Sequence, residues 1–214
     1  MGFTPYKFKG KTMIKTPLST QYESSSSFRE AFSQIVDAAS VSLKDQIILK
    51  VTLLDTKLGA MIAIADEKVL YLLEFFDPQR LESKIGKLRQ KIKAVIVPGI
   101  TDPIRSIESE LNHYFEGTLK EFKTPLFSFG SSFQKRVWDE LKKIPYGKTC
   151  SYASLAIAVD SPLAVRAVGS ANRTNQIAIV IPCHRVINTN GGLGGYAGGL
   201  TRKEWLLQHE KQNC

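Results

Sequence analysis

The change in hydrophobic spacing along residues 46–115 constrains the fold more than any other feature of the sequence. The segment begins with three short apolar runs typical of β-strands, at 48–54, 59–65 and 69–76. Two stretches with apolar residues at helical spacing follow, 81–92 and 104–115, on either side of a strand-like run at 94–97. This order predicts a small α/β domain over residues 46–124, and no pattern within it indicates catalysis.

The first 45 residues differ in pattern from the domain that follows. Residues 1–20 show no periodicity and predict a flexible tail. Residues 21–45 place Phe28, Phe32 and Ile35 at helical spacing behind a run of serines. This piece resembles the last helix of the second helix-turn-helix in AraC-type regulators. A transcriptional regulator is one hypothesis for the chain, but such a module needs several more helices. We therefore interpret residues 21–45 as a remnant of a longer, fused ancestor.

The net charge and the cysteine content indicate which partners the protein binds and in which cellular compartment it is found. Among 214 residues, 29 Lys and Arg face 20 Asp and Glu, a net charge of +9. This excess favours a polyanionic partner such as DNA, although a basic surface without such a partner is the alternative. Three cysteines form neither a disulfide framework nor a paired metal-ligand spacing. We find no apolar run of the ~20 residues that cross a bilayer and no signal peptide. A cytoplasmic or nucleoid-associated protein without membrane contact is expected.

Residues 125–214 predict a mostly helical domain. Ser131 and Gln134 are spaced as a capping box at the start of a helix that Pro145 ends. Two short helices, 152–158 and 161–172, are joined by a tight turn and fit a helix-turn-helix. The apolar run 177–181 then predicts a buried strand. A glycine-rich loop at 191–199 leads to a final helix at about 202–210.

Cys183 is the candidate nucleophile, because it stands between Pro182 and the basic pair His184-Arg185. A cysteine reacts as the thiolate, and nearby basic groups raise the thiolate fraction. A histidine needs an oxygen partner that fixes its tautomer, and Glu210 is an acidic candidate in this half of the chain. A Cys-His pair also occurs in inert protein cores, so the residues alone leave a catalytic and a structural role open. One Cys and one His are too few for a four-ligand zinc site, and no metal is expected.

Four sequence motifs in the C-terminal part of the chain add to the evidence from Cys183. IPYGKTCSYASLA, RAVGSANRTN, IVIPCHRVI and GGYAGGLTRKEWLLQHE resemble the O6-alkylguanine-DNA alkyltransferase family in order and spacing. The resemblance implies an α/β (α+β) protein with an N-terminal ribonuclease-H-like domain and a C-terminal winged-helix-like domain. It also implies a single-turnover methyltransferase that moves an alkyl group from O6-alkylguanine in double-stranded DNA to Cys183. Such a protein acts as a monomer and needs no cofactor. Whether O4-alkylthymine is also a substrate stays open.

The resemblance further implies a role for individual residues. Cys183 is the acceptor, His184 its base and Glu210 the partner of that base, as in a triad. Asn175 is implied to brace the turn at the active site and Tyr152 to help rotate the damaged nucleotide and assist the leaving guanine. A plain turn residue is the alternative for Asn175. Arg166 would fill the space of the extruded base, or it is an ordinary surface arginine that contacts phosphate.

Two further groups of residues follow from the resemblance. One group contacts the minor groove from the second helix of the helix-turn-helix, together with Arg166 and Tyr152: Ala164, Ala167, Gly169, Ser170 and Arg173. The other group surrounds the extruded base: Tyr196, Ala197, Val186, Gly198 and Lys203. For Lys203 a solvated helix lysine is the alternative.

Departures from the family pattern and rival functions complete the prediction. Many relatives carry Asn-Pro-X-Pro where this chain has Asn175-Gln176-Ile177-Ala178, which is expected to loosen the turn and slow the reaction or lower stability. Ala197 replaces a serine found in many relatives. A lesion-binding protein without enzyme activity is the main rival, but alkyltransferase-like proteins lack the cysteine that Cys183 provides. A cysteine hydrolase is a more distant rival, because it leaves the helix-turn-helix unexplained.

Overall fold

The structure is a computed structural model that describes residues 46–214. The predictions of a flexible tail at 1–20 and a helical remnant at 21–45 lie outside the described residues. The described chain divides into two compact units. The N-terminal unit comprises the described residues up to His113 together with Phe122–Phe127, and the C-terminal unit comprises Tyr114–Glu121 and Ser128–Cys214.

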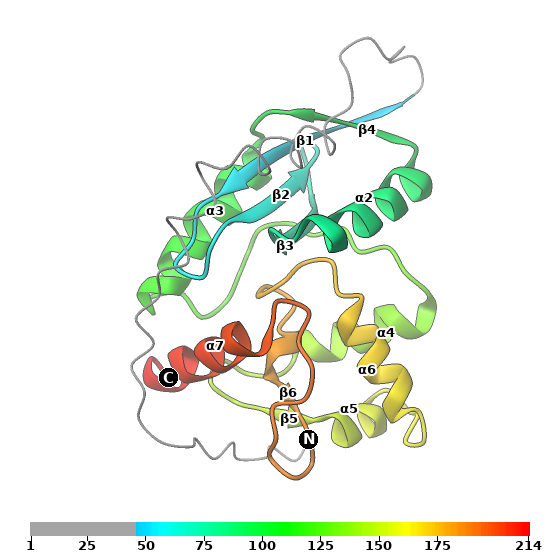
Figure 1. Ribbon diagram of the computed structural model, residues 1–214, viewed down its shortest axis with the longest axis vertical. Coiled ribbons are helices and arrows are strands. Elements are labelled where there is room, and N and C mark those ends of the chain that lie inside the picture. The colour runs from blue at the N-terminus through cyan, green and yellow to red at the C-terminus, as the bar shows by residue number, and fades with distance from the viewer. Residues whose placement is uncertain (1–45) are drawn as a thin grey trace. The chain divides into compact units, whose positions relative to one another are not determined.

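The N-terminal unit is built on a four-stranded sheet, drawn in cyan to green in Figure 1. Its strands are β1 (Ile47–Leu54), β2 (Met61–Ala65), β3 (Leu70–Phe75) and β4 (Ala94–Pro98), and they lie in the order β3-β2-β1-β4. β2 is antiparallel to both β1 and β3, whereas β4 pairs parallel to β1. A parallel partner needs a crossover connection, and helix α2 (Pro78–Ile92) provides it between β3 and β4.

Two helices supply the rest of this unit's core. α2 begins where the sequence predicts, with Pro78 in the first turn and Asp77 capping through a hydrogen bond from the Arg80 amide. Leu81, Ile85 and Leu88 of α2 are buried, as are Ile104, Ile107 and Leu111 of α3 (Asp102–Glu116). These are the residues that the helical spacing selects, so the α/β prediction for this part of the chain is confirmed in its elements.

The segment just before Phe127 follows β3 closely. The Leu70 amide donates to the Pro125 carbonyl at 2.8 Å, and the Phe127 amide donates to the Leu70 carbonyl at 2.9 Å. The carboxylate of Glu110 on α3 accepts hydrogen bonds from the amides of Lys123 and Thr124. This stretch is therefore part of the N-terminal unit.

The C-terminal unit is mostly helical. It contains α4 (Ser132–Lys142), α5 (Tyr152–Ala158), α6 (Val165–Arg173), α7 (Leu200–Gln212), the short 3-10 helix η1 (Cys183–Arg185) and two short parallel strands, β5 (Cys150–Ser151) and β6 (Val186–Ile187). In Figure 1 the β5–β6 pair lies between α7 and the group formed by α4, α5 and α6. The capping box at α4 is confirmed, since Ser131 accepts from the Gln134 amide and Gln134 accepts from the Ser131 amide.

Helices α5 and α6 form the predicted helix-turn-helix. Ser151 caps α5 by accepting from the Ser154 amide at 2.9 Å. α6 begins at Val165, later than the predicted start at 161, because Asp160 adopts a left-handed conformation (φ 54°) and residues 161–164 form a turn. α6 is held against α4 by the Trp138 indole, which donates to the Ala171 carbonyl at 2.9 Å. No helix among residues 46–214 has the length and apolar character needed to cross a membrane.

Candidate active site at Cys183

The segment that leads to Cys183 corrects one prediction. The apolar run 177–181 is not a strand but a series of tight turns, in which the Ile181 amide donates to the Ile177 carbonyl at 3.0 Å and Ile179 adopts φ 70°. The run is buried as expected, but a short buried apolar run does not by itself distinguish a strand from other buried segments. The turns place Cys183, which is 6% exposed, at the first position of η1.

Asn175 holds these turns in place from the inside. Its Oδ1 accepts from the Ile177 amide at 3.0 Å, and its Nδ2 donates to the Ile181 carbonyl at 2.8 Å. The same Nδ2 donates to the Sγ of Cys183 at 3.2 Å. A hydrogen bond donated to sulfur stabilises the thiolate form, which is the reactive one. Asn175 therefore connects the backbone of the turn to the candidate nucleophile, which a plain turn residue does not do.

The residue after Asn175 anchors the same turn from the outside. The Gln176 side chain donates from Nε2 to the Phe129 carbonyl at 2.5 Å and accepts from the Phe129 amide at 3.4 Å. Gln176 stands at one of the positions where the family pattern is expected to have proline. The turn lacks the rigidity that proline gives, but it is tied to residue 129 by two hydrogen bonds.

His184, which follows Cys183 in η1, forms a buried pair with Glu210. His184 Nε2 lies 2.8 Å from Glu210 Oε1, and both side chains are fully buried. Burial lowers the pKa of His184, and this effect outweighs the opposing influence of the carboxylate. Burial alone would raise the pKa of Glu210, but His184 and Arg185 hold it well below its usual range. An ionised carboxylate only accepts hydrogen bonds, so a neutral His184 carries its proton on Nε2 and leaves Nδ1 as the basic nitrogen.

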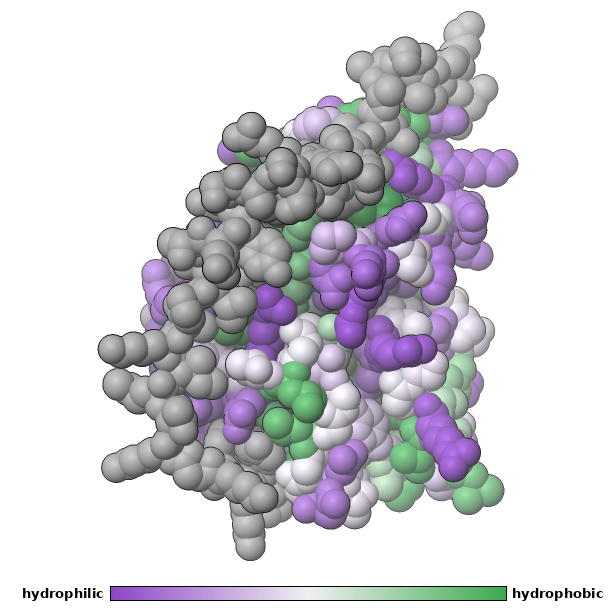
Figure 2. Space-filling model, in the orientation of Figure 1, coloured by the Kyte–Doolittle hydropathy of each residue, from purple (hydrophilic) through white to green (hydrophobic). Residues whose placement is uncertain are grey.

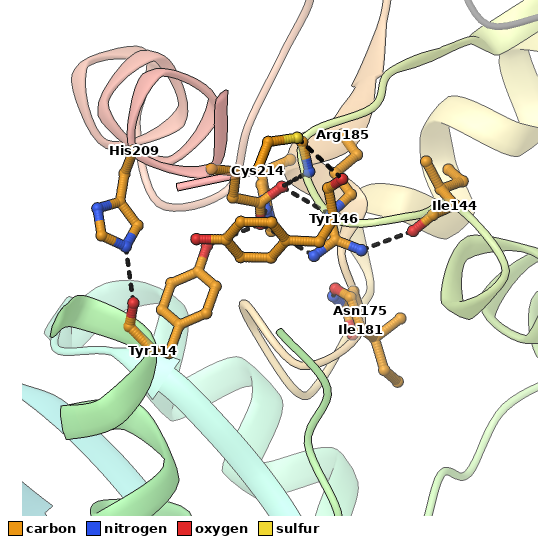
Figure 3. A network of polar contacts seen from close by, with 11 residues as sticks. Tyr114, Ile144, Tyr146, Asn175, Ile181, Arg185, His209 and Cys214 are labelled. Atoms are coloured by element: carbon orange, nitrogen blue, oxygen red, sulfur yellow. Dashed lines mark hydrogen bonds and ion pairs between the residues drawn. The ribbon is translucent and has the colours of Figure 1, made fainter. Parts of the chain in front are cut away.

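Glu210 has further partners that the sequence did not indicate. Arg185 donates to both of its oxygens, from Nε at 2.8 Å and from Nη2 at 3.0 Å. The Tyr114 hydroxyl donates to Oε1 at 2.8 Å, and the Gly147 amide donates to Oε2 at 3.1 Å. Figure 3 labels Arg185 and Tyr114, which come from different segments of the chain. The adjacency of Arg185 to His184 was visible in the sequence, but its pairing with Glu210 was not.

Tyr152 and Lys203 also lie near Cys183. Tyr152, at the first position of α5, donates to the Gly195 carbonyl at 3.3 Å. Lys203 is fully buried and donates to the carbonyls of Val186, Leu193 and Gly195. Burial lowers the pKa of Lys203 to about 8, and the neighbouring Cys183 thiolate opposes this shift. The alternative that Lys203 is a solvated helix lysine is wrong, because its ammonium group instead organises the glycine-rich loop beside Cys183.

The glycine-rich loop closes in on Tyr152. A side chain at Gly194 would meet the Tyr152 ring at 2.9 Å, and Gly194 adopts φ 65°, so both space and backbone conformation require glycine there. The Tyr196 ring stands edge-on to His184, with the ring centres 6.4 Å apart. The Gly198 carbonyl accepts from Arg202 at 2.9 Å. The loop thus brings Tyr196 close to His184, and Lys203 ties the loop to the Val186 carbonyl.

The residues expected to contact DNA lie on α6 and the turn before it. Arg166, Ala167, Ser170 and Arg173 are exposed, whereas Ala164 and Gly169 are partly covered. Gly169 faces the Tyr152 ring at the edge of contact distance, which links this helix to the site. Leu163 in the turn is 98% exposed, and Ile157 near the end of α5 is 65% exposed. Figure 2 shows hydrophobic and hydrophilic side chains side by side over this end of α5 and α6.

Metal ligands do not gather in the part of the chain that the structure describes. Within residues 46–214 no group of three or more His, Cys, Asp or Glu side chains is arranged to hold an ion. Among the described residues, Cys150, Cys183 and Cys214 form no disulfide. The site itself presents the Cys183 thiol and the His184 imidazole with its buried carboxylate partner.

The sequence matches known proteins over both halves. Residues 132–212 match the family model described as 6-O-methylguanine DNA methyltransferase, DNA binding domain. The chain is 40% identical over 161 residues to a methylated-DNA–protein-cysteine methyltransferase of Methanosarcina barkeri, an alignment that covers 75% of this chain and 96% of the relative. It is 42% identical over 158 residues to the Mycobacterium leprae protein of the same name, with 74% and 90% coverage.

Solved structures agree with this assignment. The O6-methylguanine methyltransferase of Mycobacterium tuberculosis matches with a TM-score of 0.64 at 37% identity, over 78% of this chain and 94% of that one. A structure of Mycobacterium tuberculosis OGT in complex with DNA matches with a TM-score of 0.65 at 36% identity, over 78% and 95%. On the extent of these matches, the chain belongs to the family of methylated-DNA–protein-cysteine methyltransferases.

Proposed function

We propose that this protein repairs DNA by direct reversal, with Cys183 accepting the alkyl group of an O6-alkylguanine once and irreversibly. The observation that carries the proposal is the arrangement around the sulfur. Asn175 donates to Cys183 Sγ at 3.2 Å, and the adjacent His184 is held by Glu210 at 2.8 Å. This arrangement lies in a chain whose relatives are named for transfer from methylated DNA to a protein cysteine.

The chemistry begins with deprotonation of the thiol. His184 Nδ1 is the basic nitrogen, and it takes the proton of Cys183 through a bridging water while Nε2–H stays bonded to Glu210. The thiolate then attacks the alkyl carbon in line with its bond to O6. The carbon–sulfur bond forms as the carbon–oxygen bond breaks, and the electron pair stays on the guanine, which takes up a proton. The product thioether is a poor leaving group, so the protein is consumed.

Tyr152 and Lys203 assist from the side of the departing base. The Tyr152 hydroxyl donates a hydrogen bond to the guanine as charge develops on the ring, which makes guanine a better leaving group. Lys203 places a buried ammonium group near the thiolate and holds the loop carbonyls of Leu193 and Gly195. The extruded base is held by Tyr196, Ala197, Gly198 and the backbone of Val186.

DNA binding is assigned to α6. Its exposed face presents Arg166, Ala167, Ser170 and Arg173, and small side chains on such a face let the helix approach the minor groove closely. The target base lies inside a duplex, so it is extruded at a cost of a few kcal/mol. Arg166 stacks in the space that the base leaves and offsets part of that cost. The net charge of +9 favours the same partner. We propose that the protein acts on double-stranded DNA as a monomer inside the cell.

The test is transfer from a duplex that contains O6-methylguanine, with purified protein in excess, followed by intact mass and peptide mapping. The expected result is one methyl group per chain on Cys183, absent in Cys183→Ala and retained in the thiol control Cys214→Ser. Absence of transfer together with tight lesion binding would replace this proposal with the lesion-flagging function.

A further inference from the structure

We infer that Arg185 is a positioning residue that keeps His184 neutral and protonated on Nε2, by balancing the buried charge of Glu210. The inference rests on the proposed function for its chemical meaning, since only a neutral His184 can accept the proton of Cys183. The protonation state of His184 can be measured without alkyl transfer.

The geometry around Glu210 is the first argument. Three donors meet Oε1, namely Tyr114 Oη, His184 Nε2 and Arg185 Nη2, at 2.8, 2.8 and 3.0 Å. Two more meet Oε2, namely Arg185 Nε and the Gly147 amide, at 2.8 and 3.1 Å. A carboxylate whose contacts are all hydrogen-bond donors is stabilised in its ionised form. Glu210 is therefore ionised in the folded protein. Either His184 or Arg185 must carry the positive charge that compensates it.

Charge balance decides which of the two carries it. The Glu210 and His184 side chains are fully buried, and Arg185 is 6% exposed. With Arg185 charged and His184 neutral, the three groups sum to zero. Protonation of His184 would leave one uncompensated positive charge in a buried place, which is costly. Without Arg185, the same carboxylate would favour a protonated His184, as an opposite charge at this distance ordinarily does.

The surrounding groups act in the same direction or are neutral. His184 shares η1 with Cys183 and Arg185, and α7 contributes Glu210 and the ammonium of Lys203. Burial lowers the pKa of His184, and Arg185 and Lys203 reinforce this against Glu210. The phenols that face this cluster are Tyr114 from α3, Tyr146 from the segment after α4, and Tyr196 from the glycine-rich loop. Burial raises the pKa of Tyr114 well above its usual value and that of Tyr146 to about 12, so neither competes as an anion.

An arginine suits this position better than a lysine. Its third nitrogen, Nη1, donates to the Ile144 carbonyl at 2.6 Å, and its guanidinium lies over the Tyr146 ring at 5.7 Å. Figure 3 shows the dashed contact between Arg185 and the Ile144 carbonyl. A planar fork can serve both carboxylate oxygens and the carbonyl at once, whereas an ammonium group is a point charge.

The experiment is nitrogen NMR of labelled imidazole in the whole protein. The chain has three histidines, so the signals of His113 and His209 are assigned by substitution to Gln. We expect His184 in the wild type to be neutral at pH 7, with the proton on Nε2. In Arg185→Met the midpoint of His184 titration should rise by about 1–2 pH units. Arg185→Lys, which keeps the charge, should restore most of the wild-type midpoint, and Arg136→Met on the exposed side of α4 should leave it unchanged.

The pH profile of methyl transfer provides the second readout. In Arg185→Met the acidic limb should move upward with the titration, so that the rate falls about tenfold at pH 6 and recovers at higher pH. A purely structural role would lower the rate equally at every pH. Should Arg185→Met fail to fold, two measurements still test the inference. They are the protonation state of His184 in the wild type and the His184 titration midpoint of Arg185→Lys compared with that of the wild type. A protonated His184 in the wild type at pH 7, or a Lys variant that behaves no better than Met, overturns the inference. A neutral His184 in a protein that transfers no methyl group would overturn the proposed function alone.

Discussion

The Nδ2 atom of Asn175 lies 3.2 Å from the Sγ atom of Cys183. The same nitrogen donates to the Ile181 carbonyl, and the Oδ1 of the same amide accepts from the Ile177 amide. One buried side chain thus sets the shape of the turn and contacts the sulfur that the turn carries. A change at Asn175 is therefore expected to affect stability and reactivity together.

Asn175→Asp separates the two effects from a simple loss of volume. The carboxylate can still accept from Ile177 but donates nothing, so the Ile181 carbonyl and the sulfur lose their donor. We expect a loss of about 1–3 kcal/mol of unfolding free energy. We also expect methyl transfer to slow by at least about tenfold, because a carboxylate beside sulfur disfavours the thiolate. Denaturant unfolding and single-turnover transfer measure both. Asn190→Asp on the exposed loop is the control, and a variant with wild-type kinetics would contradict the role of Asn175.

Much of the fold could be predicted because local signals and tertiary packing agree. Ser131 and Gln134 form the predicted capping box, and Leu81, Ile85 and Leu88 are buried on the predicted face of α2. The prediction of a strand at 177–181 is wrong because burial, hydrophobicity and length are all consistent with a strand. The information that decides it is the Asn175 side chain, which takes the backbone groups that a strand would pair with a neighbour.

The site could be predicted in part for a related reason. Cys183 and His184 are adjacent in the sequence, and Glu210 is one of few acids in that half, so their association was accessible. Tyr114 meets Glu210 across 96 positions of sequence, and Arg185 meets it across 25. Nothing in the local pattern of either residue signals this contact, because it is created by how Tyr114, η1 and α7 come together within the C-terminal unit.

Gln176→Ala tests whether the turn depends on its tether to residue 129. The substitution removes the hydrogen bonds to the Phe129 carbonyl and amide. We expect a loss of about 1–2 kcal/mol of unfolding free energy and a modest fall in transfer rate, because a looser turn presents Cys183 less uniformly. The exposed helix residue Gln208 provides the control as Gln208→Ala. An unchanged unfolding midpoint would show that the turn is stable without the tether.

Glu210→Gln tests the buried carboxylate through its pH dependence. Five donors face an amide that can no longer accept from all of them, so we expect a loss of about 3–5 kcal/mol at neutral pH. The pKa of Glu210 is lower in the folded protein than its ordinary value of 4.5. Its contribution to stability is therefore fully present above that value and is lost as the pH falls below it.

The advantage of the wild type over Glu210→Gln should consequently shrink between about pH 5 and pH 3. Urea unfolding at a series of pH values measures this difference directly. Glu204→Gln, on the same helix, should show no such trend. A gap that stays constant to pH 3 would mean that Glu210 is not held as an anion in the folded protein.

Arg166→Ala tests the proposed role of α6 in extruding the base. If Arg166 occupies the space of the base, its loss should slow repair of duplex DNA by about tenfold or more, because part of a cost of a few kcal/mol is no longer offset. Repair of a single strand, where the base is already unpaired, should fall much less.

Arg173→Ala is the matched comparison, since a phosphate contact alone should weaken repair of both substrates by similar factors and reduce the salt dependence of binding. Equal losses in Arg166→Ala on duplex and single strand would reduce Arg166 to such a phosphate contact, and base extrusion would then need another side chain on the exposed turn, where Leu163 is 98% exposed.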